Sequence, residues 1–350
     1  MRLLIAASGT GGHLFPAIAT AEKLNDYEIE WLGVPERLER QLVPKQYRLH
    51  TIPVEGFQQR GLATLRVLAK LVGSVLQVRS LLKQGQFGGV FTTGGYIAAP
   101  AIMAARSLGL PVILHESNAL PGKVTRWLAP WCSLVAVGFE AAAKYLSRAQ
   151  VVHVGTPVRA QFLSPQPLDL PIPPDVPLIV VSGGSQGAVA VNKLVRQCAP
   201  VWFEAGAWLV HQTGEKDPEA DSLKHPQYIS MPFYENMAGL FQRANLVISR
   251  AGAGTLAELA VTKTPSILIP YPFAAEDHQA YNAAVFEKAG AALVFRQKDL
   301  TAEVLQERVL DLIKSPDKLQ KMTESAAALA VPDSSSRVAM LVRELIEKSI

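Results

Sequence analysis

The sequence predicts an α/β protein of two doubly wound, parallel-sheet domains that face each other across a central cleft. Apolar runs alternate with helical patterns along nearly the whole chain, which is the order of elements in a parallel α/β sheet. A glycine-rich turn follows the first apolar run, and a second such turn follows half a chain later. The 350 residues exceed one typical core, so two domains of roughly 150 to 200 residues are expected.

The strand-like runs fall into two sets. The first set comprises residues 3–7, 29–33, 89–92, 111–114, 134–137 and 151–154. The second set comprises residues 178–182, 207–211, 227–230, 245–249, 266–269 and 291–295, and helical patterns close the chain at 301–314, 316–329 and 334–348. Each set predicts one doubly wound sheet, and such sheets bind ligands at the carboxyl ends of their strands.

A proline-rich segment separates the two sets. From Ser164 to Pro177 the chain holds six prolines. Proline favours extended backbone and cannot continue a helix or a central strand. This segment is therefore expected to be an extended connection between the domains.

The composition is that of a folded protein, with 49% hydrophobic and 18% charged residues and no low-complexity tract. Disorder is therefore not expected. Cys132 and Cys198 lie far apart and outside any Cys/His cluster, which disfavours a disulfide framework or a zinc site and fits a reducing cytoplasm. No apolar stretch approaches the roughly 18 residues of a membrane span, and the first run is too short for a signal peptide.

Positive charge is concentrated in the first half. Residues 1–160 hold 17 lysines and arginines against 9 acidic residues, whereas the rest holds 17 against 21. The interval between Glu55 and Glu116 contains no acidic residue, and its cations are Arg60, Arg66, Lys70, Arg79, Lys83 and Arg106. This distribution indicates an anionic partner surface.

Within this interval, Leu62 to Leu82 has apolar residues at helical spacing with cations among them. Two interpretations stay open for this helix. It either packs one face on the core with solvated lysines on the other, or docks peripherally on anionic lipid.

The first glycine-rich turn, Gly9 to His13, follows an apolar run and precedes a helical pattern. Such a turn brings backbone amides and a helix dipole to an anion. Leu14 stands where a dinucleotide fingerprint needs glycine, and no Gly-Lys-Ser/Thr ending is present, so an NAD site and an ordinary ATPase are disfavoured. His13 either braces the turn or accepts a proton from a hydroxyl nucleophile.

The second turn, Gly183 to Gly187, matches the Gly-x-Ser-x-Gly nucleophile elbow with Ser185 at its centre. A serine hydrolase would need a downstream acid and histidine, for which Asp277, His278 or Glu258 are available. That alternative assigns no function to the first half of the chain.

A third glycine-rich turn occupies residues 249–259. Its amides suit a diphosphate, and Glu258, one helical turn in, suits a ribose diol. The loop from Pro270 to Asn282 gathers polar groups, of which Gln279 and Asn282 are candidates to bind sugar hydroxyls.

Seven motifs together resemble, in content and order, the MurG family of UDP-N-acetylglucosamine:undecaprenyl-diphospho-muramoylpentapeptide N-acetylglucosaminyltransferases. They are Gly9-Thr10-Gly11-Gly12-His13 with Pro16, Gly94-Gly95-Tyr96, His115-Glu116-Ser117-Asn118, Gly155-Thr156-Pro157-Val158-Arg159, Gly183-Gly184-Ser185-Gln186-Gly187, Arg250 to Glu258, and Asp277-His278-Gln279. The resemblance runs from the first residue to the last helices. Ser117 and Thr156 depart from the family pattern, where glutamine and asparagine are common, and this puts fine contacts in doubt.

The resemblance implies a GT-B fold of two Rossmann-like domains whose final helix crosses back to the first domain. It implies residues 1–160 with 335–350 as the acceptor and membrane-side domain, and 161–334 as the UDP-sugar domain. The implied reaction transfers N-acetylglucosamine from UDP-N-acetylglucosamine to the 4-hydroxyl of the muramoyl unit of lipid I, with inversion, giving lipid II. No cofactor, metal or nucleic acid is implied, and the implied location is peripheral, on the cytoplasmic face of the plasma membrane.

The resemblance also implies site residues. His13 is the candidate base, while Thr10, Gly11, Gly12 and Asn118 lie near the donor sugar and Arg159 and Ser185 reach toward the phosphates. The backbone of Tyr234 meets the uracil, Gln279 meets a sugar hydroxyl, and the diphosphate and ribose lie on Ala253, Gly254, Thr255, Leu256, Ala257 and Glu258. Gly94, Gly95 and Tyr96 belong to the acceptor side.

Three alternatives to this activity stay open. One is a related GT-B transferase acting on another lipid acceptor. The others are the serine hydrolase and a binding or scaffolding role, and the last is disfavoured because a histidine, a diphosphate cradle and a ribose-binding carboxylate exceed what docking requires.

Overall fold

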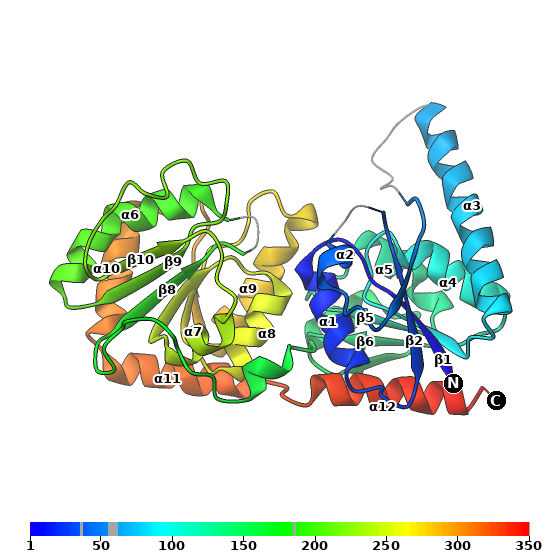
Figure 1. Ribbon diagram of the computed structural model, residues 1–350. Coiled ribbons are helices and arrows are strands. Elements are labelled where there is room, and N and C mark those ends of the chain that lie inside the picture. Colours follow the sequence, from blue (N-terminus) through cyan, green and yellow to red (C-terminus); the bar gives the residue numbers. More distant parts are fainter. Residues whose placement is uncertain (36–37, 55–61, 185–186, 350) are drawn as a thin grey trace. The chain divides into compact units, whose positions relative to one another are not determined.

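The computed structural model describes residues 1–35, 38–54, 62–184 and 187–349, with side chains of the first five residues of the helix from Leu62 left undescribed (Figure 1). The chain divides into two compact units. Unit 1 comprises Met1–Arg159 and Pro332–Ile350, and unit 2 comprises Ala160–Val331.

The described part of unit 1 contains a seven-stranded sheet in which all paired strands are parallel, in the order β3-β2-β1-β4-β5-β6-β7. Its strands are β1 (Arg2–Ala6), β2 (Glu28–Gly33), β3 (Arg48–Thr51), β4 (Gly89–Thr92), β5 (Val112–Glu116), β6 (Leu134–Val137) and β7 (Val151–His153). The strand order reverses between β1 and β4. Loops that leave these two neighbours diverge to opposite faces, and the resulting crevice is where doubly wound sheets bind ligands.

Helices cover both faces of this sheet. They are α1 (Gly11–Ala21), α2 (Glu39–Leu42), α3 (Leu62–Gln84), α4 (Ala98–Ser107), α5 (Lys123–Leu128) and α12 (Ser334–Glu347), with 3-10 turns η1 (Ala129–Trp131) and η2 (Glu140–Tyr145). Along β1, Leu3 and Ile5 pack with α1 and α12, whereas Leu4 and Ala6 pack with α3 and α4. This alternation explains the uninterrupted apolar run, because successive strand side chains point to opposite faces and both are buried.

The last helix, α12, belongs to unit 1. It packs against α1 through a buried stripe that includes Val338, Val342 and Ile346. Arg343 fixes its end, since Nε donates to Asp26 Oδ2 at 2.9 Å and the guanidinium donates to the Lys23 carbonyl at 2.7 Å.

In unit 2 the described residues form a six-stranded sheet with parallel pairing in the order β10-β9-β8-β11-β12-β13. Its strands are β8 (Leu178–Ser182), β9 (Trp208–Gln212), β10 (Tyr228–Met231), β11 (Leu246–Ser249), β12 (Ser266–Leu268) and β13 (Ala292–Val294). Its helices are α6 (Val189–Glu204), α7 (Met237–Arg243), α8 (Ala253–Val261), α9 (His278–Ala289), α10 (Ala302–Ile313) and α11 (Pro316–Ala328), with 3-10 turns η3 (Ala160–Leu163) and η4 (Ala275–Asp277). Here the order reverses between β8 and β11.

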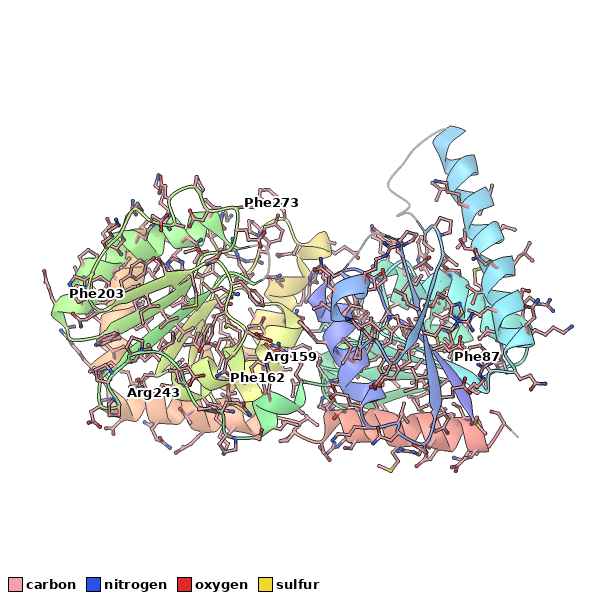
Figure 2. All side chains as sticks on the ribbon, in the orientation of Figure 1. Phe87, Arg159, Phe162, Phe203, Arg243 and Phe273 are labelled. Atoms are coloured by element: carbon pink, nitrogen blue, oxygen red, sulfur yellow. The ribbon has the colours of Figure 1, made fainter. Side chains whose placement is uncertain are left out.

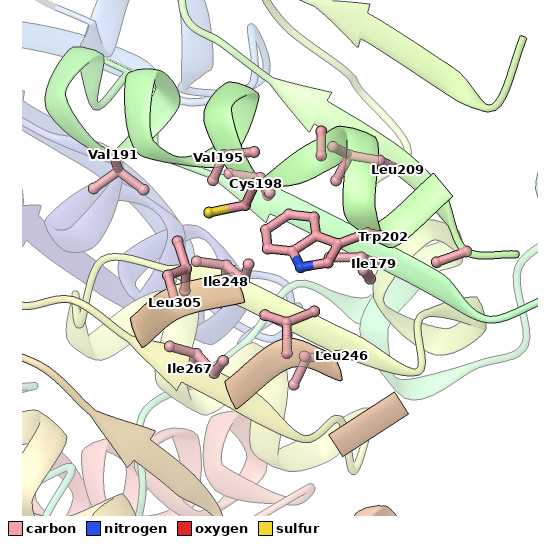
Figure 3. Packing of buried hydrophobic residues seen from close by; sticks show 14 of the residues in the cluster. Ile179, Val191, Val195, Cys198, Trp202, Leu209, Leu246, Ile248, Ile267 and Leu305 are labelled. Carbon is pink, nitrogen blue, oxygen red and sulfur yellow. The ribbon is translucent and has the colours of Figure 1, made fainter. Parts of the chain in front are cut away.

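The core of unit 2 centres on Trp202 of α6, which is fully buried between α6, α10 and the sheet (Figure 3). Its neighbours in the cluster include Ile179 of β8 and Leu246 of β11. The buried indole nitrogen has no hydrogen-bond acceptor among the described residues. The side chain therefore stabilises unit 2 through apolar contact alone.

The predicted elements are confirmed, with one addition. Every predicted strand-like run overlaps a strand, and the three closing helices are α10, α11 and α12. The strand β3 was not predicted, because Arg-Leu-His-Thr carries little apolar signal; it pairs only with β2 in the described sheet, so it is an edge strand. The proline-rich segment, predicted as the connection between the domains, instead lies within unit 2, which begins at Ala160. It is held there by Arg243, which donates to the carbonyls of Pro173, Pro174 and Val176 (Figure 2).

The buried face of α3 agrees with the core-facing interpretation of the helix at Leu62 to Leu82, whereas docking on anionic lipid stays a prediction. On α3, Val67, Ser74, Val78 and Leu82 are buried. Every fourth residue on another face is an exposed aliphatic side chain, with exposures of 50% for Leu68, 53% for Val72 and 61% for Leu76. A core-facing helix does not need this outer stripe.

We expect Trp202→Ala to lower the free energy of unfolding by about 3 to 5 kcal/mol, because it opens a large cavity in the core. Trp202→Phe should cost much less, since the lost indole N–H has no acceptor. Chemical denaturation of both variants measures the two costs. Equal costs would contradict the apolar role given to Trp202.

Candidate active site

His13 lies in the first turn of α1, at the edge where β1 and β4 end. Its Nδ1 is 2.6 Å from the carbonyl oxygen of Thr93, which directly follows β4. In return, the Thr93 hydroxyl donates to the His13 carbonyl at 2.9 Å. The two loops of the strand-order reversal are therefore joined through this histidine.

The contact with Thr93 determines the tautomer of His13. A carbonyl oxygen only accepts, so Nδ1 must carry the proton and donate it. In the neutral ring, Nε2 then has a free lone pair. A neutral histidine in this tautomer can accept a proton from a hydroxyl group at Nε2.

The turn at Gly94 and Gly95 packs against the imidazole. Both residues have left-handed φ angles, +87° and +74°, which favour glycine. A Cβ at Gly94 would lie 3.7 Å from His13 Cε1, and one at Gly95 would lie 3.7 Å from Nε2. Glycine thus leaves room beside Nε2. Tyr96, next in the chain, is 39% exposed.

Asn118 is oriented by a buried carboxylate. Glu116 ends β5, and its Oε1 accepts from both the amide and the side-chain Nδ2 of Asn118, each at 3.0 Å. Its Oε2 accepts from the amide of Gly122 at 3.1 Å, at the start of α5. Glu116 therefore shapes the whole loop that presents Asn118.

The neighbouring His115 is fully buried and structural. Its Nε2 donates to the Gly155 carbonyl at 2.9 Å, and Nδ1 is 3.3 Å from the Ser117 hydroxyl, which donates to it. Burial lowers the pKa of His115, so the ring is neutral. Ser117, which departs from the family pattern, thus has His115 as its hydrogen-bond partner.

Arg159, labelled in Figure 2, has its guanidinium carbon over the ring of Phe15 of α1, 4.4 Å from the ring centre. Phe15 also limits Gly11, where a Cβ would lie 2.8 Å from the phenyl ring. The structure therefore groups Arg159 with Gly11 and the start of α1. Thr10 is the N-cap of α1, but its side chain makes no capping hydrogen bond.

In unit 2, the glycines after β8 are required by close backbone contacts. A Cβ on Gly183 would lie 2.5 Å from the amide nitrogen of Ala188, and one on Gly187 would lie 2.5 Å from the Thr213 carbonyl oxygen. Ser185 lies outside the described residues. The turn therefore brings its described backbone close to the beginning of α6, next to the end of β9.

The residues from Ala253 to Glu258 form the first two turns of α8, which follows β11. Gly252 is the N-cap and provides no side-chain oxygen, so the first amides of the helix are open to an anion. A Cβ on Gly254 would meet no atom within 4 Å, so space is open beside these amides. Ala253 and Leu256 are buried, whereas Thr255, Ala257 and Glu258 are half-buried.

Gln279 lies at the first turn of α9 and is fixed by two backbone amides. Its Oε1 accepts from the amides of Ala251 at 3.1 Å and Tyr271 at 2.9 Å. This leaves Nε2 as the end that can donate to a ligand. Asn282 is fully buried and donates to the Ala251 carbonyl at 3.1 Å, so it braces this loop; its predicted contact with a sugar hydroxyl does not fit that burial.

Tyr234 lies between β10 and α7, and burial of its ring raises the pKa of the phenol. Asp277 and His278, which the sequence offers for a serine hydrolase, each have another hydrogen-bond partner. Both oxygens of Asp277 accept from Arg296, at 2.8 and 2.7 Å, and His278 Nδ1 donates to the Ala275 carbonyl.

The structure thus assembles two groups of predicted residues. Unit 1 brings together Thr10, Gly11, Gly12, His13, Gly94, Gly95 and Arg159 at the β1 and β4 edge. Unit 2 brings the residues of α8 next to Gln279 through Ala251. Within the described ranges, no three His, Cys, Asp or Glu side chains are placed to hold a metal ion.

Three residues that shape the site have no role assigned from the sequence. Thr93 sets the tautomer of His13, Phe15 supports Arg159, and Glu116 orients Asn118. Glu116 is recognisable in the sequence as a polar residue, because it follows His115 at the end of a strand that begins with three apolar residues. Thr93 acts through its backbone carbonyl, so its residue type gave no signal.

Comparison with known proteins identifies the family of the chain. Residues 3–137 match the glycosyltransferase family 28 N-terminal domain, and residues 178–338 match the C-terminal domain of the same family. The UDP-N-acetylglucosamine--N-acetylmuramyl-(pentapeptide) pyrophosphoryl-undecaprenol N-acetylglucosamine transferase of a Nostoc species is 71% identical over 352 residues, covering 99% of each chain. The enzyme of the same name from Nostoc punctiforme is 70% identical, covering 99% of this chain and 98% of that protein.

Solved structures give the same relationship. MurG from Acinetobacter baumannii has a TM-score of 0.81 at 29% identity, covering 98% of this chain and 99% of that one. A kitacinnamycin glycosyltransferase has a TM-score of 0.76 at 17% identity and shows the fold alone. The fold is therefore GT-B, with two Rossmann-like parallel-sheet units, and by sequence identity over its whole length the chain belongs to the MurG family of glycosyltransferases.

Proposed function

We propose that the protein is a hexosyltransferase that moves N-acetylglucosamine from UDP-N-acetylglucosamine to the 4-hydroxyl of the muramoyl unit of lipid I, producing lipid II with inversion. The relatives named above support both substrates. The observation that carries the proposal is the hydrogen bond from His13 Nδ1 to Thr93, because it leaves Nε2 free to act as a base.

In this reaction, His13 Nε2 accepts the proton of the 4-hydroxyl as its oxygen forms a bond to the anomeric carbon of the donor. The bond between that carbon and the diphosphate oxygen breaks on the opposite side, and UDP leaves with the electron pair. A single displacement of this kind inverts the anomeric centre. The negative charge that develops on the diphosphate must be stabilised by donors placed in advance.

Unit 2 carries suitable donors for UDP. The open amides at the start of α8 and its helix dipole favour the diphosphate. Glu258, one turn further, accepts from the ribose hydroxyls, and the fixed Gln279 donates through Nε2 to a sugar hydroxyl. We assign the uracil to the backbone near Tyr234, the phosphates also to Ser185 and Arg159, and the donor sugar to Asn118 and the Thr10 to Gly12 turn.

The acceptor is a lipid, so we further propose that unit 1 binds the anionic cytoplasmic surface of the plasma membrane through α3. Leu68, Val72 and Leu76 form an exposed aliphatic stripe on this helix. Arg79 and Lys83 are exposed on the same helix, and Lys70 is partly exposed. Apolar side chains beside cations suit the interface of an anionic bilayer. None of the helices in the described ranges is long and apolar enough to span a membrane.

Transfer to a different lipid acceptor is the alternative with most support, since it would use the same donor site. It predicts UDP release with another polyprenyl-diphosphate sugar and none with lipid I. A serine hydrolase has little support, because Asp277 is engaged by Arg296 and does not orient His278.

The first test concerns His13. We expect His13→Ala to lower kcat by about 100-fold to 10,000-fold, since general-base help is lost, while the Kd for UDP stays unchanged. The assay measures transfer from labelled UDP-N-acetylglucosamine to a lipid I analogue, and titration calorimetry measures UDP binding. His153→Ala, at an exposed histidine of the same unit, is the matched control. Full activity in His13→Ala would rule out the histidine as base.

The second test concerns Glu258. We expect Glu258→Gln to raise the Kd for UDP by about tenfold or more, because charge-assisted hydrogen bonds to the ribose are weakened. The variant and the original protein should bind 2′,3′-dideoxy-UDP equally. Glu307→Gln, at an exposed carboxylate of α10, serves as control. A loss of affinity that is the same for both nucleotides would place Glu258 away from the ribose.

The third test concerns α3. Reversing Lys70, Arg79 and Lys83 to Glu should weaken binding to vesicles containing anionic lipid by at least about a hundredfold, because each cation near such a surface contributes about 1 kcal/mol. Vesicle sedimentation measures the binding. The matched variant reverses Lys193, Lys224 and Lys321, which are exposed cations of unit 2, with the same change in net charge. Equal binding by the two triple variants would refute docking through α3.

A further inference from the structure

Unit 2 contains a buried polar cluster that the proposed reaction does not use. Its members are Asn192 and Arg196 on α6, His211 on β9, Tyr228 on β10, and Asp217 in the loop after β9. Asn192 and His211 are fully buried, and Arg196 and Asp217 are each 8% exposed. Polar groups so far from water are retained at a cost unless each finds a partner.

The hydrogen bonds fix every proton around Asn192. Its Nδ2 donates to Asp217 Oδ2 at 2.7 Å and to the Thr213 carbonyl at 2.8 Å, and both of these groups only accept. Its Oδ1 therefore faces His211, whose Nε2 donates to it at 3.0 Å. His211 Nδ1 then accepts from the Tyr228 hydroxyl at 2.9 Å. Burial lowers the pKa of His211 to about 4, which agrees with this neutral ring.

Asp217 is an ionised carboxylate held from several sides. Arg196 donates to Oδ2 at 2.8 Å and to Oδ1 at 3.3 Å, and the amide of Glu219 donates to Oδ1 at 3.1 Å. Burial raises the pKa of Asp217, but hydrogen bonds from Arg196 and Asn192 outweigh it, so the pKa is lowered overall. The loop after β9 is thereby attached to the first two turns of α6.

The cluster ends at the glycine-rich turn. The Thr213 carbonyl, which accepts from Asn192, lies against Gly187, where a Cβ would approach to 2.5 Å. Gly187 has a φ of +71° and its amide donates to the Gly184 carbonyl at 3.0 Å. Two residues later α6 begins. Any shift of Thr213 therefore shifts the backbone that leads into α6.

We propose that Asn192 and Asp217 are positioning residues for donor binding, which hold the Thr213 carbonyl against Gly187 and so fix the backbone at the start of α6 for the diphosphate of UDP-N-acetylglucosamine. The proposal rests on the proposed function, in which this edge of unit 2 binds the donor. Neither side chain touches the substrate. Their effect reaches it through the backbone of Thr213 and Gly187.

The test compares two truncations on α6. Asn192→Ala removes the hub of the cluster, and we expect it to raise the Kd for UDP and the KM for UDP-N-acetylglucosamine by about tenfold, while the KM for lipid I stays unchanged. Val195→Ala truncates a fully buried apolar residue of the same helix and should leave all three constants unchanged. Melting temperatures are measured for both, because a merely structural role would affect the two variants alike.

An unchanged Kd for UDP in folded Asn192→Ala would overturn the proposal, and so would an equal rise in Val195→Ala. If Asn192→Ala does not fold, Tyr228→Phe is used in its place, since it removes only the hydroxyl that donates to His211. A raised Kd for UDP in Tyr228→Phe supports the proposal, and an unchanged Kd for UDP overturns it. Because UDP binding is measured without acceptor, the outcome is separate from the proposed reaction. Original protein that binds UDP but transfers nothing to lipid I would contradict that reaction alone.

Discussion

Each sheet is built only from parallel pairs among its described strands, and this constraint determines where the site residues lie. Parallel strands all end at the same edge, so every loop that follows a strand emerges there. In unit 1 the strand order reverses between β1 and β4, and in unit 2 between β8 and β11. The turns that begin at Gly9, Gly94, Gly183 and Gly252 follow those four strands. At Gly183 and Gly187, glycine is required because backbone segments approach too closely for a Cβ, whereas at Gly94 it is favoured by a φ of +87°.

The two sheet edges carry groups of different chemistry. In unit 1, a backbone carbonyl holds His13 in the tautomer that leaves Nε2 as an acceptor, and no neighbouring acid is needed for this. In unit 2, the start of α8 offers unoccupied amides and the dipole of a helix, which suit a leaving diphosphate. In the proposed reaction, unit 1 provides the proton acceptor and unit 2 provides the hydrogen-bond donors. An inverting displacement needs both of these groups.

Strands and helices were predictable from sequence because both faces of each sheet are buried, so the strands are continuous apolar runs such as Leu3 to Ala7. The edge strand β3 was not, because its residues are mostly polar. Contacts between residues far apart in the sequence could not be predicted either. Asp217 and Asn192 are 25 residues apart, and the carbonyl of Thr93 is 80 residues from His13. The burial of Asn282 belongs to the same class, since its sequence context is that of an exposed polar loop.

The buried cluster behind Gly187 is best explained by geometry and not by stability. Burying Arg196 with Asp217 removes both charges from water, and apolar residues of similar volume often stabilise a fold equally well. Apolar side chains, however, would not fix the Thr213 carbonyl in one direction, because their contacts carry no directional preference. Asn192 does so with two N–H groups that have separate acceptors, and its oxygen is fixed by His211. The proposed contact of this turn with a diphosphate, made through backbone amides, needs this directional precision, since the turn has no side-chain charge of its own among its described residues.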